Sequence, residues 1–274
     1  MTAKRPRRWP ISLAAIVVLQ CAVYSCGAAD ALLLHPSRDP IGVALGVERR
    51  EIAFGGGKLD TWVASSKRGA APEAYVLAFD GNASRAEACA SRVADLFDDR
   101  SVQVWAVNYP GYGASDGEAE LDRLAPAALV AYDELVRVAD GKPIFVYGNS
   151  MGATVALHVV TKRPVAMTVL QNPPPLRRLI LWRHGWWNLW LLALPIALSL
   201  PGELDAVSSA ETARVPAVFV TAEQDSIVPP SHQDVVYESY GGPKRRVFAP
   251  GGHNDRVDAA TQESVRSAVR EFVK

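Results

Sequence analysis

Short apolar runs alternate with longer amphipathic stretches through most of the chain. The first two runs, Val47–Phe54 and Thr61–Ser65, flank Gly55-Gly56-Gly57, which predicts a hairpin turn. Buried strands are predicted at Tyr75–Phe79, Val102–Val107, Ile144–Tyr147, Met167–Leu170, Ala217–Thr221 and Arg246–Ala249. Helices are predicted at Ser84–Asp98, Leu121–Ala139, Met151–Lys162, Gln233–Ser239 and Asp258–Val273. This alternation predicts an α/β fold, with a mostly parallel sheet and helices on both faces.

The alternation is interrupted by an insert at about residues 173–213. Three prolines, at positions 173–175, end the preceding element, and four tryptophans follow within nine residues: Trp182, Trp186, Trp187 and Trp190. Two interpretations stay open. The tryptophans pack against the domain, or they belong to a lid that lines an acyl pocket or rests in a membrane interface, where tryptophan is favoured. The uncharged run 186–200 is too short for a second membrane span.

The first 32 residues have the pattern of an export signal or a membrane anchor. Four basic residues, between Lys4 and Arg8, precede the uncharged stretch Trp9–Ala29, whose length is close to the roughly 20 residues that span a bilayer. Cys26 stands in a weak lipobox, whereas Ala29-Asp30-Ala31 resembles an ordinary cleavage site. Because basic flanks stay in the cytoplasm, we expect residues 33–274 to lie on the extracytoplasmic side, periplasmic or in the cell envelope in a bacterium.

Composition narrows the classes of partner. The 274 residues carry 29 basic and 29 acidic side chains, and the body has no basic patch, which argues against nucleic acid as a partner. No Cys/His cluster has the spacing of metal ligands. With Cys21 and Cys26 in the leading segment, Cys89 stands alone; we expect no disulfide framework and a cysteine buried in a helix.

The pentapeptide Gly148-Asn149-Ser150-Met151-Gly152 lies between the apolar run 143–147 and the helix-like run 153–160. That layout predicts a nucleophile elbow, in which a tight strand-to-helix turn exposes the serine and small neighbours avoid clashes. The N-terminus of the following helix favours a developing oxyanion.

A nucleophilic serine needs a base, and the base needs an orienting carboxylate. Asp225 follows the predicted strand 217–221, and His253 follows the predicted strand 246–249, so the order is Ser, Asp, His with each group in a strand-end loop. Glu223 is the alternative acid in the same loop. The other histidines, which suit surface or packing roles better, are His35, His158, His184 and His232.

Four segments together resemble a serine hydrolase of the α/β-hydrolase superfamily: Asn108–Ser115 with Gly117, Gly148–Gly152, the loop 225–229, and Gly252–Asp255. The resemblance is greatest to the membrane-attached branch that includes Bem46-like proteins and α/β-hydrolase domain proteins acting on lipids and acyl-proteins. It implies an α/β-hydrolase fold with Ser150, His253 and Asp225 as the triad. It also implies oxyanion donors at the backbone N–H groups of Asn82 and Met151, and no cofactor.

One position departs from that family pattern. The turn after the first parallel strand commonly reads His-Gly-Asn-Ala, whereas here it reads Asp80-Gly81-Asn82-Ala83. An ionised carboxylate near a developing oxyanion would oppose it, because like charges repel at short range. Either Asp80 turns away and is hydrogen-bonded, or the activity is weakened.

The sequence thus predicts hydrolysis of a carboxylic ester or thioester through an acyl-enzyme. The apolar insert favours a small-molecule substrate with an acyl chain, such as a lysophospholipid, a monoacylglycerol or an acyl ester. Two alternatives stay open. A serine aminopeptidase would need acids to bind an amine, and the insert offers only Glu203, Asp205 and Glu211. A non-catalytic binding protein on the same fold would explain Asp80.

Overall fold

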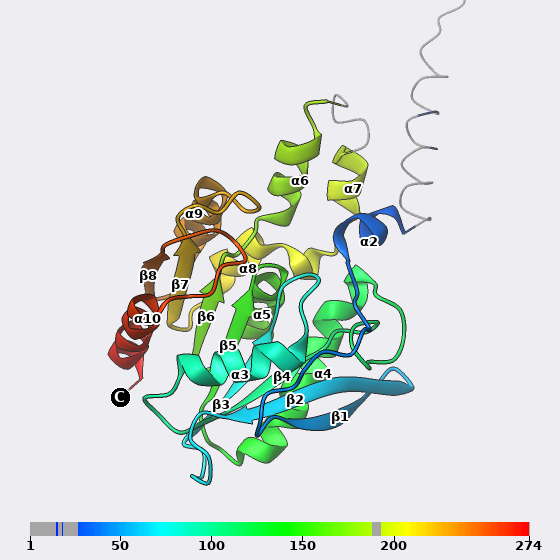
Figure 1. Cartoon of the computed structure of the whole chain (residues 1–274). Coiled ribbons are helices and arrows are strands. Elements are labelled where there is room, and N and C mark those ends of the chain that lie inside the picture. Colours follow the sequence, from blue (N-terminus) through cyan, green and yellow to red (C-terminus); the bar gives the residue numbers. More distant parts are fainter. Residues whose placement is uncertain (1–14, 16–17, 19–26, 188–192, 274) are drawn as a thin grey trace, which may run out of the picture.

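In the computed structural model, an eight-stranded sheet forms the centre of the protein, with strand order β1-β2-β4-β3-β5-β6-β7-β8 (Figure 1). The structure describes residues 15, 18, 27–187 and 193–273. The strands are β1 (Glu48–Phe54), β2 (Gly57–Ser65), β3 (Ala74–Phe79), β4 (Val102–Val107), β5 (Ile144–Asn149), β6 (Met167–Gln171), β7 (Ala217–Ala222) and β8 (Lys244–Ala249). Every predicted strand is present, with bounds that differ by a few residues.

The first two strands form the predicted hairpin. Gly55 and Gly56 connect them with φ of 58° and 80°, values that residues with a Cβ rarely adopt. Strand β2 pairs antiparallel with β4, and the remaining strands are parallel. The mostly parallel α/β architecture is therefore confirmed.

Helices cover both faces because successive strand residues point to opposite sides of the sheet. On β3, Leu77 belongs to one buried cluster and Val76 to the other. The second cluster is covered by α3 (Ala86–Leu96) and α10 (Ala259–Phe272), while the first is covered by α4 (Leu121–Ala139), α5 (Met151–Lys162), α8 (Ala206–Thr212) and α9 (Pro230–Ser239). Cys89 is fully buried in α3, as expected, and its burial raises the pKa of the thiol.

The segment between β6 and β7 contains α6 (Leu176–His184), α7 (Ala193–Ser199), η1 (Gly202–Leu204) and α8. Figure 1 shows α6 and α7 projecting from the body next to α2 (Ala28–Leu33), whereas α8 packs on α5. The predicted insert thus has helices of its own, and its role as a lid stays a prediction. Trp190 lies outside the described residues.

The residues around α2 pack on the body of the protein. Ala29 and Leu34 are buried, and the carboxylate of Asp30 accepts a hydrogen bond from the amide of Leu121 at 2.8 Å. Contacts with the body therefore begin before residue 33, where we expected the domain to start. Within the described part of the chain, no helix has the length and apolar character to cross a membrane. Cys26 and most of the stretch 9–29 lie outside that part.

Candidate active site

Ser150 occupies a strained turn between β5 and α5. Its φ of 52° and ψ of −123° are unusual for a residue with a side chain. Close packing around the turn requires the flanking glycines. A Cβ at Gly148 would lie 2.4 Å from the carbonyl oxygen of Gly152, and a Cβ at Gly152 would lie 2.2 Å from that of Phe79. The turn thus has the geometry of a nucleophile elbow.

A continuous chain of hydrogen bonds joins the three predicted catalytic side chains. His253 Nε2 lies 2.9 Å from Ser150 Oγ, and His253 Nδ1 lies 2.6 Å from Asp225 Oδ2. The aspartate and the histidine come from the loops that follow β7 and β8. This arrangement can deprotonate the serine hydroxyl as it attacks a carbonyl carbon, because the histidine is placed as a base and the aspartate holds its ring.

Asp225 is only 3% exposed, so its carboxylate needs hydrogen-bond donors to offset lost hydration. The amides of Ile227 and Val228 donate to Oδ1 at 2.9 and 2.7 Å, and Gln233 Nε2 donates to Oδ2 at 3.0 Å. The alternative acid, Glu223, is exposed. The sequence analysis did not identify Gln233. The only local signal for its role is its position, one helical turn into α9 and after an acidic loop.

Asn172 is a second residue that the sequence analysis missed. It follows β6 with φ of 48°, and its side-chain oxygen accepts a hydrogen bond from the amide of Ala222 at 2.9 Å. Its side-chain nitrogen donates to the carbonyl of His253 at 3.4 Å. Asn172 therefore connects the ends of two strands to the histidine loop.

One predicted oxyanion donor, Met151, belongs to the elbow, and the other, Asn82, belongs to the turn that follows β3. Met151 is the first residue of α5, where a backbone N–H has no acceptor within the helix. The side chain of Asn82 holds the facing turn: its oxygen accepts from the amide of His35 and the hydroxyl of Tyr112, both at 2.8 Å, and its nitrogen donates to the carbonyl of Leu33. Residues 33–35 therefore help to build the predicted oxyanion turn.

Asp80 is buried and fully engaged, which agrees with the first of the two expectations for it. One carboxylate oxygen pairs with Arg92 Nη2 at 2.7 Å; the other accepts from the amide of Gly81 at 2.8 Å and from Asn149 Nδ2 at 2.9 Å. Burial opposes the charge of Arg92, yet the attraction of Asp80 keeps the pKa of the guanidinium above its ordinary value. The charge of Asp80 is thus paired with that of Arg92, and its hydrogen bond from Asn149 ties the oxyanion turn to the elbow.

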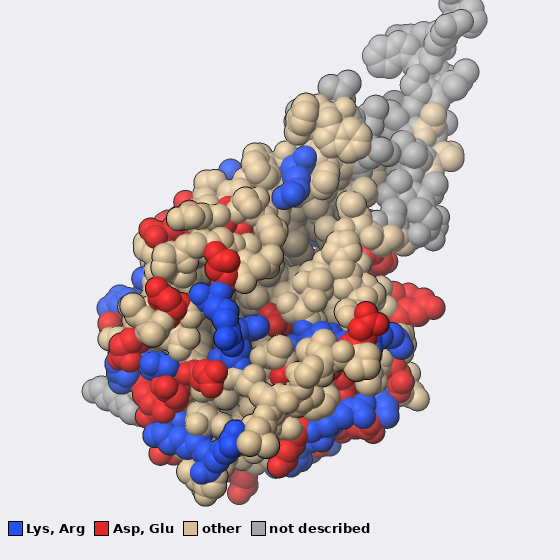
Figure 2. Space-filling view, viewed as in Figure 1, with Lys and Arg blue, Asp and Glu red and all other residues tan. Residues whose placement is uncertain are grey.

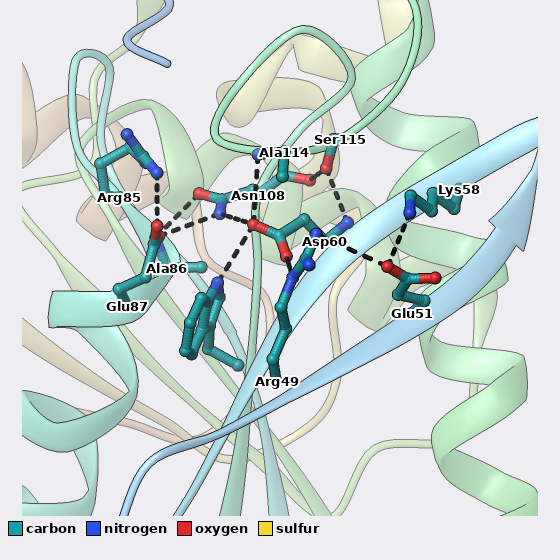
Figure 3. A network of polar contacts seen from close by, with 11 residues as sticks. Arg49, Glu51, Lys58, Asp60, Arg85, Ala86, Glu87, Asn108, Ala114 and Ser115 are labelled. Atoms are coloured by element: carbon teal, nitrogen blue, oxygen red, sulfur yellow. Dashed lines mark hydrogen bonds and ion pairs between the residues drawn. The ribbon is translucent and has the colours of Figure 1, made fainter. Parts of the chain in front are cut away.

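A buried polar network supports the loop that precedes α4 (Figure 3). Asp60, on β2, accepts from Arg49 Nε at 2.5 Å and from Asn108 Nδ2 at 2.8 Å. Burial tends to raise the pKa of Asp60, but the hydrogen bonds from Arg49, Asn108 and Trp62 outweigh it and hold that pKa below 3.8. The network extends through Arg85, Ala86, Glu87, Ala114 and Ser115, so it fixes both the loop 108–117 and the start of α3.

The tryptophans of the insert are not buried against the domain where the structure describes them. Trp182, Trp186 and Trp187 are 52%, 73% and 58% exposed. The Trp182 ring lies 4.8 Å from that of His232, at the start of α9. In the described ranges, no group of three or more His, Cys, Asp or Glu side chains is arranged to hold a metal ion.

Comparison with known proteins agrees with the fold. Residues 83–214 match the model of the alpha/beta hydrolase family. An esterase of Pyrococcus furiosus has the same fold, with a TM-score of 0.67 at 16% identity, over 88% of this chain and 98% of that one. The protein thus has an α/β-hydrolase fold, and its residues 83–214 are similar to the alpha/beta hydrolase family.

The chain is also similar to two curated proteins. An uncharacterized protein of Mycobacterium tuberculosis is 27% identical over 265 residues, which cover 93% of this chain and 91% of that protein. An uncharacterized membrane protein of Saccharomyces cerevisiae is 24% identical over 63% of this chain and 61% of its own length. The similarity to a membrane protein agrees with the membrane-attached branch that the motifs resemble.

Proposed function

We propose that this protein is a serine hydrolase that cleaves carboxylic ester or thioester bonds. The observation that carries the proposal is the unbroken hydrogen-bond chain from Ser150 Oγ through His253 to Asp225. A poor nucleophile placed next to a histidine, which is itself held by a buried carboxylate, is the arrangement that acyl transfer requires. The strained backbone of Ser150 supports the same role, because such strain concentrates at functional sites.

The proposed reaction proceeds in two halves. Ser150 Oγ attacks the carbonyl carbon while His253 Nε2 takes the hydroxyl proton, and the amides of Asn82 and Met151 stabilise the oxyanion. His253 then gives the proton to the leaving alcohol or thiol, and an acyl-enzyme forms. Water attacks this ester with His253 again as the base, which releases the acid and restores the serine.

The proposed substrate is a lipid-like molecule with an acyl chain. The exposed, apolar surface of α6 and α7, in the segment that follows β6, supports this, as does the apolar stretch at the start of the chain. That stretch would attach the protein to a membrane, with residues 33–274 on the extracytoplasmic side. The name of the yeast relative supports the attachment.

A series of p-nitrophenyl esters with acyl chains of two to twelve carbons tests the proposal with the full-length chain in detergent. We expect kcat/KM to rise with chain length and to fall by at least about 10⁴-fold in Ser150→Ala. Ser264→Ala, an exposed serine on α10, is the matched control and should keep full activity.

Three results would redirect the proposal. Activity on short esters only would remove the lipid-like substrate but keep the hydrolase. Faster cleavage of aminoacyl p-nitroanilides than of any ester would favour the aminopeptidase alternative. A folded protein that hydrolyses neither would favour the binding protein.

A further inference from the structure

The projecting helices α6 and α7, together with the residues directly after α6, carry several large, exposed apolar side chains. We define the tryptophan face as Trp182, Trp186, Trp187, Leu194 and Leu198, which are 52%, 73%, 58%, 45% and 58% exposed. Large apolar side chains gathered on one exposed surface mark an interaction site, because a soluble surface rarely exposes so many together. The partner must therefore offer an apolar environment.

The charges around the tryptophan face have one sign. Residues 173–202 contain no Asp or Glu, and their arginines are Arg177, Arg178 and Arg183. Arg177 pairs with Asp205 at 2.9 Å, whereas Arg178 and Arg183 are exposed on α6. Figure 2 shows the projecting end of the molecule as mainly tan, with basic side chains on it. Apolar residues flanked by arginines suit a surface that is apolar inside and negatively charged outside.

The position of the tryptophan face adds a second argument. Helix α2 packs against α7 (Figure 1), so the described chain enters the body next to this face. Residues 9–29, which end in α2, carry no charged side chain. Tryptophan is favoured at the membrane–water boundary because its ring is apolar and its N–H is polar. The uncharged stretch that ends in α2 and the tryptophans of the face therefore both favour the same side of the molecule as the one that meets a membrane.

We propose that the tryptophan face binds the interface of a bilayer that contains anionic lipids. Binding there would set the insert that follows β6 against the membrane surface. Gln171, the last residue of β6, accepts the hydrogen bond from the amide of Ser150 at 2.8 Å, so the bound insert would lie next to the proposed active site. The binding itself does not depend on the proposed hydrolysis.

Quenching of tryptophan fluorescence by brominated phosphatidylcholine tests this with the full-length chain in vesicles. The wild type is compared with a Trp182→Phe, Trp186→Phe, Trp187→Phe variant, so the tryptophans outside the face contribute equally to both. We expect quenching in the wild type, a smaller quenched fraction in the variant, and stronger quenching of the wild type when phosphatidylglycerol is added. Trp62→Phe, on β2, is the matched control and should not lower the quenched fraction.

Two results would overturn the proposal. Equal quenching in the wild type and the triple variant would show that the face does not reach lipid. Protection of the face from both brominated lipid and aqueous acrylamide would show that a protein surface or a second copy covers it. An unchanged melting temperature of the triple variant confirms that it folds, and because the readout is not activity, failure here leaves the hydrolase proposal separately testable.

Discussion

Gly152→Ala tests whether the elbow and the oxyanion turn are packed as tightly as the structure indicates. The new methyl carbon would lie 2.2 Å from the carbonyl oxygen of Phe79 and 2.7 Å from that of Asp80. Both are backbone atoms at the start of the oxyanion turn, so no flexible side chain can move aside. The methyl group must displace α5 from the turn, or the turn from α5.

The size of the effect follows from these distances. Ordinary contact begins at 3.4 Å, so the backbone must shift by about 1.2 Å. Overpacking of this kind costs roughly 1–3 kcal/mol, and a rigid backbone neighbour favours the upper end. For a domain of this size, ~3 kcal/mol lowers the melting temperature by roughly 6–12 °C. Misplacing an oxyanion donor by about 1 Å lowers kcat by about 10²-fold.

Melting in detergent and ester hydrolysis measure the two effects on the full-length chain. Gly202→Ala is the matched control, because a Cβ there meets nothing within 4 Å. It should stay within about 0.5 kcal/mol of the wild type in its free energy of unfolding. Wild-type melting and turnover in Gly152→Ala would refute the reasoning, since they would mean that the elbow has room the structure does not show.

Three further substitutions probe the charged groups of the site. Asp225→Asn should lower kcat by about 10⁴-fold, because the amide holds the histidine in the wrong tautomer, and should lower the melting temperature, because the new NH2 group faces the donor Gln233 Nε2; unchanged turnover would remove Asp225 from the triad. Arg92→Met leaves the Asp80 carboxylate without its ion-pair partner. Because Arg92 is partly exposed, we expect a loss of ~1–3 kcal/mol in the free energy of unfolding. We also expect slower turnover, which a second substitution in the same chain, Asp80→Asn, partly restores. The lowered pKa of Asp60 contributes stability that is present above pH 3.8 and is lost as the pH falls through the folded pKa. The melting temperature of Asp60→Asn should therefore fall less steeply than that of the wild type below pH 3.8. Parallel curves of melting temperature against pH would contradict this.

Local pattern was enough to predict the strands, the elbow and the loops that carry the aspartate and the histidine. Each of these features is encoded within about ten neighbouring residues, by periodicity and by glycines that the turn requires. The contacts that complete the site are of another kind. Asn82 is held by Leu33 and His35, which are 49 and 47 positions away, and Asn172 reaches His253 across 81 positions.

No periodicity encodes such long-range partners, because they depend on how the strands are ordered in the sheet. The same reason explains Asp80. In the sequence it is an isolated acid in an oxyanion turn, and only the packing of α3 brings Arg92 to within 2.7 Å of it. The helices of the insert were also missed, since tryptophan density indicates an apolar surface but not its shape.

The central claim is that His253 activates Ser150 as a nucleophile. Labelling of the full-length chain with a fluorophosphonate probe, followed by mass analysis of the modified peptide, tests it most directly. We predict a single adduct on Ser150 in the wild type, and none in Ser150→Ala or His253→Ala variants that melt at the wild-type temperature. A folded wild-type protein that takes up no probe, or label that persists in Ser150→Ala, would contradict the claim.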